Sequence, residues 1–310
     1  MYKGLTIAAC VPAYNESKLI GKTILTMPDF VDHIVVVDDC STDDTSERAL
    51  EVDDPRVFLI RHEVNSGVGG AIVDAHKKAL ELGSDIDVVM AGDAQMDPAY
   101  LPAILDPIAD HGYGFTKANR FFSRDSFAGM PPTRLVGSVL LSFATKAASG
   151  YWHLFDPQNG YTAVHREALR RIHLDKVARG YEFENDLLIR LNIAGVRAQD
   201  VPVPALYGDE VSGMRLRRVI PAIGWLLLKG FWRRMFLKYV LFSFSPIALL
   251  FFTGLGLCLF GSAVGVWVVW ESLGPAVAST GSVLLAVAPL LTGLQMLLSA
   301  LTLDIQESPR

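Results

Sequence analysis

The chain has 310 residues, 51% of them hydrophobic, and a mean hydropathy of +0.31. This length suffices for one sizeable α/β domain, but the hydropathy is too high for an ordinary soluble protein. Residues 1–210 contain 20 Lys and Arg and 30 Asp and Glu, which gives a net charge of −10. Residues 211–310 contain 8 Lys and Arg and 3 Asp and Glu, which gives a net charge of +5. The acidic first part gives no reason to expect a nucleic-acid partner.

The first part of the chain alternates apolar runs of strand length with helical patterns. The runs are 5–11, 33–38, 57–61 and a fourth that ends at Met90-Ala91. Strands that alternate with helices make a mostly parallel sheet with right-handed crossovers. Because the carboxyl ends of such strands share one edge, we expect the polar residues after each strand to lie together, where open α/β sheets bind ligands.

Two of these polar segments have ordinary structural explanations when each is taken alone. Asp38 and Asp39 can cap the next helix, and Gly67-Val68-Gly69-Gly70 can be a tight helix start instead of a phosphate cradle. The glycines do not form a dinucleotide fingerprint, because they follow the third strand and lack the G-x-G-x-x-G spacing. Both alternatives stay open at this point.

The fourth strand ends in Gly92-Asp93-Ala94-Gln95-Met96-Asp97-Pro98, which holds two carboxylates and an amide. Asp93 and Gln95 stand where an oxygen-ligated cation and a phosphate are held in open α/β sheets. Asp97 is followed by proline, a usual helix start, so we predict that Asp97 caps a helix beginning at Pro98.

Two long uncharged runs occupy the end of the chain, from Tyr239 to Trp270 and from Ser272 to Leu303. Each exceeds the roughly 20 residues that cross a bilayer. Turn-forming residues separate them, so we predict a hairpin of two transmembrane helices at about 245–268 and 280–302. A buried pair of soluble helices is disfavoured, because neither run has a polar face at helical spacing.

Basic residues gather before the first span, and no acid occurs between Glu210 and Glu271. By the positive-inside rule this basic collar is cytoplasmic, and an even number of spans returns the C-terminus to the same side. We therefore expect an integral protein of the cytoplasmic (inner) membrane with its first part and both termini in the cytoplasm. Apolar and aromatic residues between the cations favour a helix in the lipid headgroup layer. The collar comprises Arg215, Arg217, Arg218, Lys229, Arg233, Arg234 and Lys238.

The predicted organisation has three parts. Residues 1–210 form the α/β domain, residues 211–238 a basic amphipathic interfacial segment, and residues 239–310 the hairpin with a short cytoplasmic tail.

Four motifs, in their order and spacing, resemble the GT-A domain of family 2 inverting glycosyltransferases. The resemblance covers residues 5 to about 210, and the hairpin is similar to that of the polyprenyl-phosphate branch, which includes dolichyl-phosphate mannose synthase and bacterial polyprenyl-phosphate glucosyltransferases. It implies an α/β fold with a Rossmann-like, mostly parallel sheet. The motifs are Val11-Pro-Ala-Tyr-Asn-Glu16, Val37-Asp-Asp-Cys-Ser-Thr-Asp43, Asn65-Ser-Gly-Val-Gly69 and Gly92-Asp-Ala-Gln-Met-Asp-Pro98.

The resemblance implies a binding site for a nucleotide-sugar donor. Its base and ribose pocket would be lined by the first motif, Asp39 would read the base edge, and Arg215 would lie near the diphosphate on a segment that closes over the donor. The residues assigned to the donor are Pro12, Ala13, Tyr14, Glu16, Asp39, Asn65, Gly67, Asp93, Gln95 and Arg215.

The resemblance also implies a divalent cation, Mg²⁺ or Mn²⁺. The family's Asp-x-Asp motif falls on Ala91-Gly92-Asp93, so the first acid is missing here. Asp93 and Gln95, with phosphate oxygens and water, still make a ligand set that either ion accepts.

The acceptor implied by the resemblance is a polyprenyl phosphate, held by Arg120 and Arg134 from segments beyond the sheet. Arginine suits a phosphate because its planar fork binds two oxygens. In relatives that use a hydroxyl acceptor a carboxylate acts as general base, and Glu184 is the nearest match. Surface arginines, and a helix-dipole role for Glu184, are the alternatives.

The implied reaction is transfer of a sugar from a nucleotide diphosphate sugar to the lipid phosphate, with inversion. UDP-glucose is the favoured donor, from the likeness of Asp156-Pro-Gln-Asn-Gly-Tyr161 to the bacterial glucosyltransferases. One alternative is a hydroxyl-directed or processive polysaccharide synthase, although the chain lacks the Gln-x-x-Arg-Trp of those enzymes. Another is a non-catalytic nucleotide-sugar sensor, suggested by Ala91. Some relatives are tetramers, so a homo-oligomer is left open.

Overall fold

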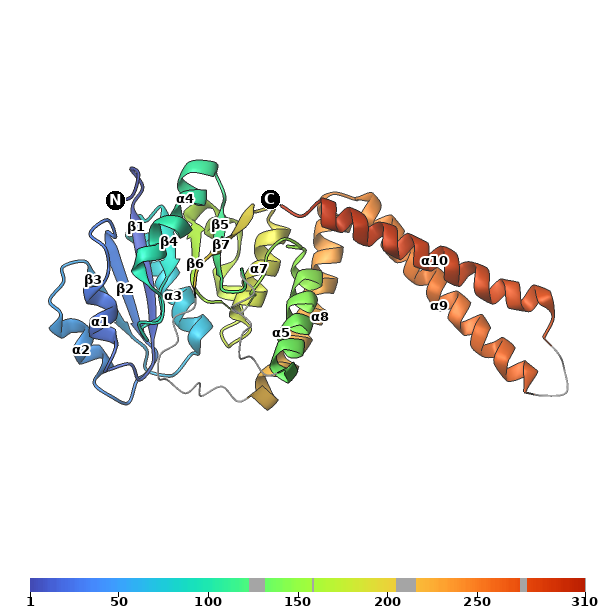
Figure 1. Cartoon of the computed structure of the whole chain (residues 1–310), viewed down its shortest axis with the longest axis horizontal. Coiled ribbons are helices and arrows are strands. Elements are labelled where there is room, and N and C mark those ends of the chain that lie inside the picture. The colour runs from blue at the N-terminus through green and yellow to red at the C-terminus, as the bar shows by residue number, and fades with distance from the viewer. Residues whose placement is uncertain (123–131, 158, 205–215, 274–277, 310) are drawn as a thin grey trace. The chain divides into compact units, whose positions relative to one another are not determined.

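The computed structural model describes residues 1–122, 132–157, 159–204, 216–273 and 278–309 (Figure 1). The chain divides into two compact units, one over Met1–Phe231 together with Pro309, and the other over Trp232–Ser308. The predicted boundaries at residues 210 and 238 stay predictions: the first falls outside the described residues, and the second lies just beyond a continuous helix, α8 (Leu216–Phe236).

The first unit is built on a seven-stranded sheet with the order β3-β2-β1-β4-β6-β5-β7. Among the described strands, β6 alone runs antiparallel to its neighbours. The expected mostly parallel sheet is confirmed, and the four predicted strands appear within a few residues of their predicted bounds. The strands are β1 (Ile7–Ala13), β2 (His33–Asp38), β3 (Val57–Arg61), β4 (Ile86–Val89), β5 (Phe115–Asn119), β6 (Thr162–His165) and β7 (Ala198–Pro202).

Helices cover both faces of this sheet, and side-chain alternation along the strands divides the core between them. In β1, Ala8 and Cys10 pack in a cluster with α3 and α7, whereas Ile7, Ala9 and Val11 pack in a second cluster with α1 and α4. The helices of this unit are α1 (Ile20–Leu25), α2 (Thr45–Glu51), α3 (Val68–Glu81), η1 (Pro98–Tyr100), α4 (Leu101–His111), α5 (Pro132–Ser149), α6 (Arg166–Arg171), η3 (Leu174–Lys176) and α7 (Phe183–Ile193).

We expected the segment that carries Arg120, which begins at Lys117, to lie beyond the sheet, and that expectation is wrong for its first residues. Lys117 is in the middle of β5, paired with β6 on one side and β7 on the other. Its side chain is fully buried, and its ammonium donates a hydrogen bond to the carbonyl oxygen of Asn159. A lysine is rarely buried in a strand, so the sequence pattern gave no strand signal here.

The second unit contains the predicted hairpin. Its helices α9 (Pro246–Ser272) and α10 (Thr280–Gln306) are long and apolar enough to cross a membrane, which agrees with the spans predicted at about 245–268 and 280–302. Glycines allow the two helices to approach closely: a Cβ added to Gly261 would lie 2.7 Å from the carbonyl oxygen of Ala286, and one added to Gly254 would lie 2.8 Å from that of Gly293. Small residues play this part in helix pairs within membranes.

A buried ion pair closes the end of the hairpin near the chain terminus. Arg234 donates to both carboxylate oxygens of Asp304, at 2.6 and 3.0 Å, and Tyr239 of the π-helical segment η4 (Leu237–Phe242) also donates to Asp304. Arg234 belongs to the basic collar, so at least one collar cation has an internal structural partner.

Candidate active site

The polar segments after β1, β2 and β4 meet at one edge of the sheet, as predicted. Ala13 pairs in register with Asp38, and the Asp39 amide donates to the carbonyl oxygen of Ala13 at 2.9 Å. On the other side of β1, the Gly92 amide donates to the carbonyl oxygen of Pro12 at 3.1 Å. A Cβ on Gly92 would lie 3.2 Å from that of Ala13, so a small residue is needed where the two strand ends touch.

The loop after β1 is held by the loop after β2. Asn15 has a positive φ of 58°, its amide donates to Ser41 Oγ at 2.9 Å, and its side-chain oxygen accepts from the Thr42 amide at 2.8 Å. The Glu16 amide donates to Thr45 Oγ1. Pro12 and Ala13 are buried, whereas the Tyr14 side chain is 49% exposed. Tyr14 is therefore the aromatic group of this loop that a bound ligand can reach.

Asp39 has a full set of partners within the protein. Its carboxylate accepts from the amides of Ser66 and Gly67, at 2.7 and 2.8 Å, from Ser66 Oγ at 2.9 Å, and contacts His62 Nδ1 at 2.8 Å. Burial by itself raises the pKa of Asp39, but these hydrogen bonds hold the pKa below its usual value. Asp39 thus anchors the glycine loop as an anion, and its predicted contact with a base stays a prediction.

The glycine loop packs against the segment that precedes α7. A Cβ on Gly67 would lie 2.6 Å from the carbonyl oxygen of Arg179, and one on Gly69 would lie 2.6 Å from Phe183 Cβ. The Gly70 amide donates to the same Arg179 oxygen at 3.0 Å. Helix α3 begins at Val68, so the glycines do form a tight helix start. Asn65, on the same loop, donates to the carbonyl oxygen of Asp39 at 3.0 Å.

The two carboxylates after β4 have different environments. Asp97 accepts from the Ala99 amide at 2.9 Å and caps the helix that starts at Pro98, which confirms the prediction. Asp93 accepts from the Gln95 amide at 3.1 Å and is half-buried. Burial raises the pKa of Asp93, and its backbone hydrogen bonds oppose that rise only in part. Among the described residues, no cation forms an ion pair with Asp93.

Asp93 and Gln95 fit the divalent cation that the sequence implies. A half-buried carboxylate without a cationic partner gains from a bound cation, and carboxylate and amide oxygens are the ligands that Mg²⁺ and Mn²⁺ accept. Ala91 offers no side-chain ligand; its amide faces Met96 Sδ at 3.3 Å. The protein would thus supply fewer oxygens than an Asp-x-Asp motif does.

Arg120 forms a bidentate ion pair with Asp156. Its Nε donates to Oδ2 at 2.7 Å and its Nη2 to Oδ1 at 2.8 Å, and its amide also donates to Oδ2. The Asp156 side chain is buried, while that of Arg120 is 35% exposed. Burial opposes the charge of Asp156, but the Arg120 guanidinium holds the pKa of that carboxyl below its usual value. The sequence did not indicate this pairing, because residues 36 positions apart give no local signal.

Glu184 also lies at this edge. The Glu184 carboxylate and the Met96 side chain both lie close to Gly160. A Cβ added to Gly160 would lie 3.7 Å from Glu184 Oε1 and 3.5 Å from Met96 Cε, so the Glu184 carboxylate is beside the turn after β4. Burial raises the pKa of Glu184, and the charge of Lys117 opposes that rise. Glu184 is in the first turn of α7, as expected.

Some predicted site residues lie outside the part of the structure that can be described. Arg215 is among the residues left out, and Arg134 lies in the first turn of α5 with its side chain left out. Their roles stay predictions.

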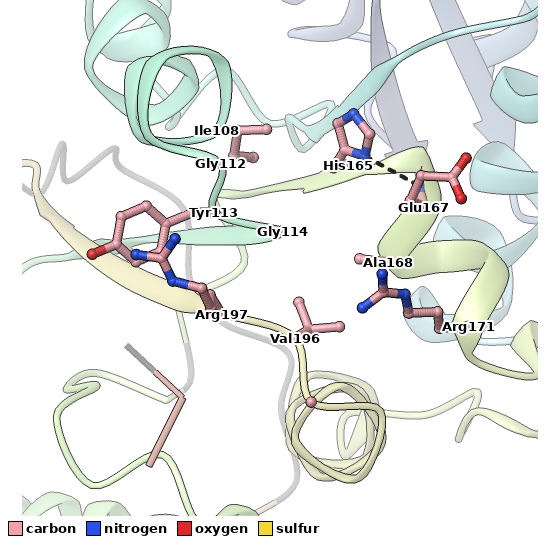
Figure 2. Close-up of a pocket in the computed structure, with 11 residues that line it drawn as sticks. Ile108, Gly112, Tyr113, Gly114, His165, Glu167, Ala168, Arg171, Val196 and Arg197 are labelled. Atoms are coloured by element: carbon pink, nitrogen blue, oxygen red, sulfur yellow. Dashed lines mark hydrogen bonds between the residues drawn. The ribbon is translucent and has the colours of Figure 1, made fainter. Parts of the chain in front are cut away.

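A pocket of about 270 Å³ lies at the opposite edge of the sheet, where β5 and β7 begin (Figure 2). Arg197 lies over the Tyr113 ring there, 4.5 Å from its centre, and His165 Nδ1 accepts from the Glu167 amide at 3.2 Å. Its lining includes none of the predicted site residues, so this pocket is separate from the candidate active site.

Comparisons with known proteins agree with the motifs at the candidate site. Residues 8–173 match the family model described as Glycosyl transferase family 2. A Methanococcus voltae protein named UDP-N-acetylglucosamine–dolichyl-phosphate N-acetylglucosaminyltransferase is 32% identical over 243 residues, which are 74% of this chain and 94% of that protein. An undecaprenyl-phosphate mannosyltransferase of Micrococcus luteus is 30% identical over 206 residues, 64% of this chain and 83% of that protein.

Among solved structures, the chain is similar to glucosyl-3-phosphoglycerate synthase from Mycobacterium tuberculosis in complex with Mn²⁺, UDP and phosphoglyceric acid. The TM-score is 0.55 at 22% identity, over 74% of this chain and 78% of that one. At this identity the likeness establishes the fold alone.

Proposed function

The chain belongs to glycosyl transferase family 2 and has the GT-A fold, and from this premise we propose that it transfers a sugar from a nucleotide diphosphate sugar to a polyprenyl phosphate. The observation that carries the proposal is the shared sheet edge at which Asp93 and the Arg120–Asp156 pair lie, in a chain that also carries two membrane-length apolar helices. Relatives named for dolichyl and undecaprenyl phosphate acceptors support it.

The lipid phosphate is the nucleophile of the proposed reaction. A phosphate monoester is largely a dianion near pH 7, since its second pKa is about 6, so it requires orientation and no deprotonation. One of its oxygens attacks the anomeric carbon from the face opposite the diphosphate. The carbon–oxygen bond to the diphosphate then breaks, and the nucleoside diphosphate leaves with the electron pair, which inverts the anomeric configuration.

The residues of the site divide these tasks. The Arg120 side chain is 35% exposed and Asp156 fixes the plane of its guanidinium, so Arg120 is suited to orient the acceptor phosphate, with Arg134 as its predicted second cation. Asp93 and Gln95 would hold Mg²⁺ or Mn²⁺, which when bound supplies positive charge against the departing diphosphate. Tyr14, whose side chain is exposed, would contact the nucleotide.

We propose UDP-glucose as the donor to test first, and UDP-N-acetylglucosamine and GDP-mannose as the comparison donors. The Methanococcus voltae and Micrococcus luteus relatives carry names with different sugars, so family membership leaves the sugar open. The likeness of Asp156–Tyr161 to bacterial glucosyltransferases is the reason for glucose.

Membrane attachment of the proposed enzyme involves more than the hairpin. In α5, the apolar side chains of Val136, Val139, Leu140 and Phe143 are exposed, and they repeat at helical spacing. In α8, Trp225 and Leu228 are exposed beside collar cations. Both helices contribute to one buried cluster with α7, so we propose that their outer faces contact the cytoplasmic leaflet.

The test is a transfer assay with purified full-length protein, undecaprenyl phosphate and the three donors, with and without a chelator. We expect one donor to give a glycosylated lipid phosphate in a metal-dependent manner. Nucleotide binding without a glycolipid product from any donor would contradict the proposal and favour a nucleotide-sugar sensor.

One observation favours a second candidate, transfer to a hydroxyl acceptor. Burial raises the pKa of Glu184, and a carboxylate with a raised pKa beside the reaction edge is suited to general base catalysis. For a hydroxyl acceptor, Glu184→Gln would abolish turnover and leave donor binding intact. For a phosphate acceptor we expect Glu184→Gln to retain turnover.

A further inference from the structure

Asp200 is a partly buried carboxylate that the proposed reaction does not use. It lies in the middle of β7, and in the register of the sheet it pairs with Lys117 of β5. Its Oδ1 is buried and accepts no hydrogen bond from the residues that the structure describes. Burial raises the pKa of Asp200 to about 7, so its charge is costly at this position.

Both partners of Asp200 Oδ2 stand next to the Arg120–Asp156 pair in the chain. Asn119 Nδ2 donates to Oδ2 at 3.2 Å, and Asn119 immediately precedes Arg120. The Phe155 amide donates to the same oxygen, and Phe155 immediately precedes Asp156. One carboxylate oxygen therefore connects the two chain segments that present the ion pair.

Other contacts strengthen this connection. The Phe121 and Phe155 rings pack edge to face with centres 6.4 Å apart, and Asn119 Oδ1 accepts from the Phe121 amide at 2.9 Å. Lys146 of α5 lies over the Phe155 ring, 4.7 Å from its centre. The charged groups that act on Asp200 include Lys117 from β5, Asp156 from the loop after α5 and Lys146 from α5.

Small errors in the position of Arg120 would weaken transfer, because an orienting group acts only while its atoms remain near the productive geometry. The two Arg120–Asp156 hydrogen bonds fix the guanidinium relative to Asp156. The Arg120 amide, which directly follows β5, ties Asp156 Oδ2 to the end of that strand at 3.2 Å. Asp200 adds a second link to the sheet, because it holds Asn119 and Phe155, the residues just before Arg120 and Asp156, to the central part of β7.

We infer that Asp200 is a positioning residue for the acceptor phosphate, which acts by holding the Asn119–Arg120 and Phe155–Asp156 segments in register. The inference rests on the proposed function for the identity of the acceptor. It concerns the acceptor side of the site, and the donor residues after β1, β2 and β4 are expected to be unaffected.

The test compares Asp200→Ala and Asp200→Asn with a control, Asp85→Asn, in the full-length protein. Asp85 also accepts a backbone hydrogen bond, from the Thr6 amide at 2.9 Å, but immediately before β4, at the opposite edge of the sheet. We expect Asp200→Ala to raise KM for undecaprenyl phosphate about tenfold or more, with KM for the nucleotide sugar changed less than twofold. Asp200→Asn keeps an acceptor oxygen and should fall between Asp200→Ala and wild type.

Hydrogen exchange supplies a second readout that needs no turnover. Amides of residues 119–122 and 154–156 should exchange faster in Asp200→Ala, and at the wild-type rate in Asp85→Asn. Unchanged exchange in both segments, or an equal rise in the two KM values, would overturn the inference. Wild-type protein that transfers no sugar to undecaprenyl phosphate would instead contradict the proposed function, and the exchange measurement would still decide whether Asp200 holds the two segments.

Discussion

Asp93 and Asp97 are four residues apart after β4, yet their carboxylates have different environments in this structure. Asp97 caps a helix, whereas Asp93 is half-buried and has no cationic partner among the described residues. We predict that Asp93→Asn abolishes metal-dependent turnover, because it removes the proposed carboxylate ligand. Asp97→Asn should keep most activity and stability, since asparagine caps a helix about as well as aspartate. Turnover and thermal unfolding of both variants check this; an inactive but folded Asp97→Asn would contradict the division.

Asp200 makes stability depend on pH. Its folded-state pKa, raised to about 7 by burial, lies above the unfolded value of about 3.9, so the folded protein binds more protons between these values. The contribution of Asp200 to the free energy of unfolding therefore falls as pH rises from about 4 to about 7. As pH rises from about 4 to about 7, we therefore expect the Tm of Asp200→Asn to rise relative to the Tm of wild type. A difference in Tm that does not change with pH would contradict the raised pKa of Asp200.

Sequence patterns predicted the residues that follow strands but not the partners that hold them. Asp93 and the Asp39 loop were found because each directly follows an apolar run, and Asp97 was found because a proline follows it. The Arg120–Asp156 pair joins residues 36 positions apart, and Asp200 contacts Asn119 across 81 positions. No local sequence pattern predicts contacts between residues so far apart. Lys117 was missed as a strand residue because its burial depends on carboxylates supplied by other elements.

At the level of elements, the glycine-rich start of α3 packs closely against the start of α7. A Cβ on Gly69 would lie 2.6 Å from Phe183 Cβ and 2.7 Å from the carbonyl oxygen of Ala178, so the start of α7, which carries Glu184, would have to move. We predict that Gly69→Ala destabilises the protein by about 1–3 kcal/mol. Gly21→Ala is the matched control, because its Cβ would meet nothing closer than Val52 Cγ2 at 3.8 Å.

The control variant, Gly21→Ala, should increase the free energy of unfolding by up to about 1 kcal/mol, because alanine has a better helix propensity than glycine. Chemical denaturation of both variants measures the difference. Equal stability of Gly69→Ala and Gly21→Ala would show that the loop and α7 can separate without cost.

The first four strands and the hairpin could be predicted from the sequence, whereas β5, β6 and β7 could not. β1 to β4 are apolar and end in recognisable motifs. β6 has only four residues, and β7 contains Gln199 and Asp200, so neither shows a clear strand pattern. The antiparallel direction of β6 depends on tertiary pairing with β4 and β5, which no local pattern encodes.

For the whole molecule, the proposed orientation puts the connection between α9 and α10 outside the cytoplasm. Glu271 is exposed at the end of α9, while Cys40 is in the first unit. We predict that Glu271→Cys, in a chain without Cys10, Cys40 and Cys258, reacts with a membrane-impermeant maleimide on intact cells. A chain with Cys40 as its single cysteine should react only after the membrane is opened. The reverse pattern would contradict the orientation.

The most direct measurement of the central proposal is the mass of the lipid product. Full-length protein is incubated with undecaprenyl phosphate, Mg²⁺ or Mn²⁺ and each nucleotide sugar, and the extracted lipid is analysed by mass spectrometry, with Asp93→Asn in parallel. We predict that one donor adds the mass of a single sugar residue to the lipid phosphate, and that Asp93→Asn and chelator both abolish the product. Sugar transfer to undecaprenol but not to undecaprenyl phosphate, or full activity of Asp93→Asn, would contradict the proposal.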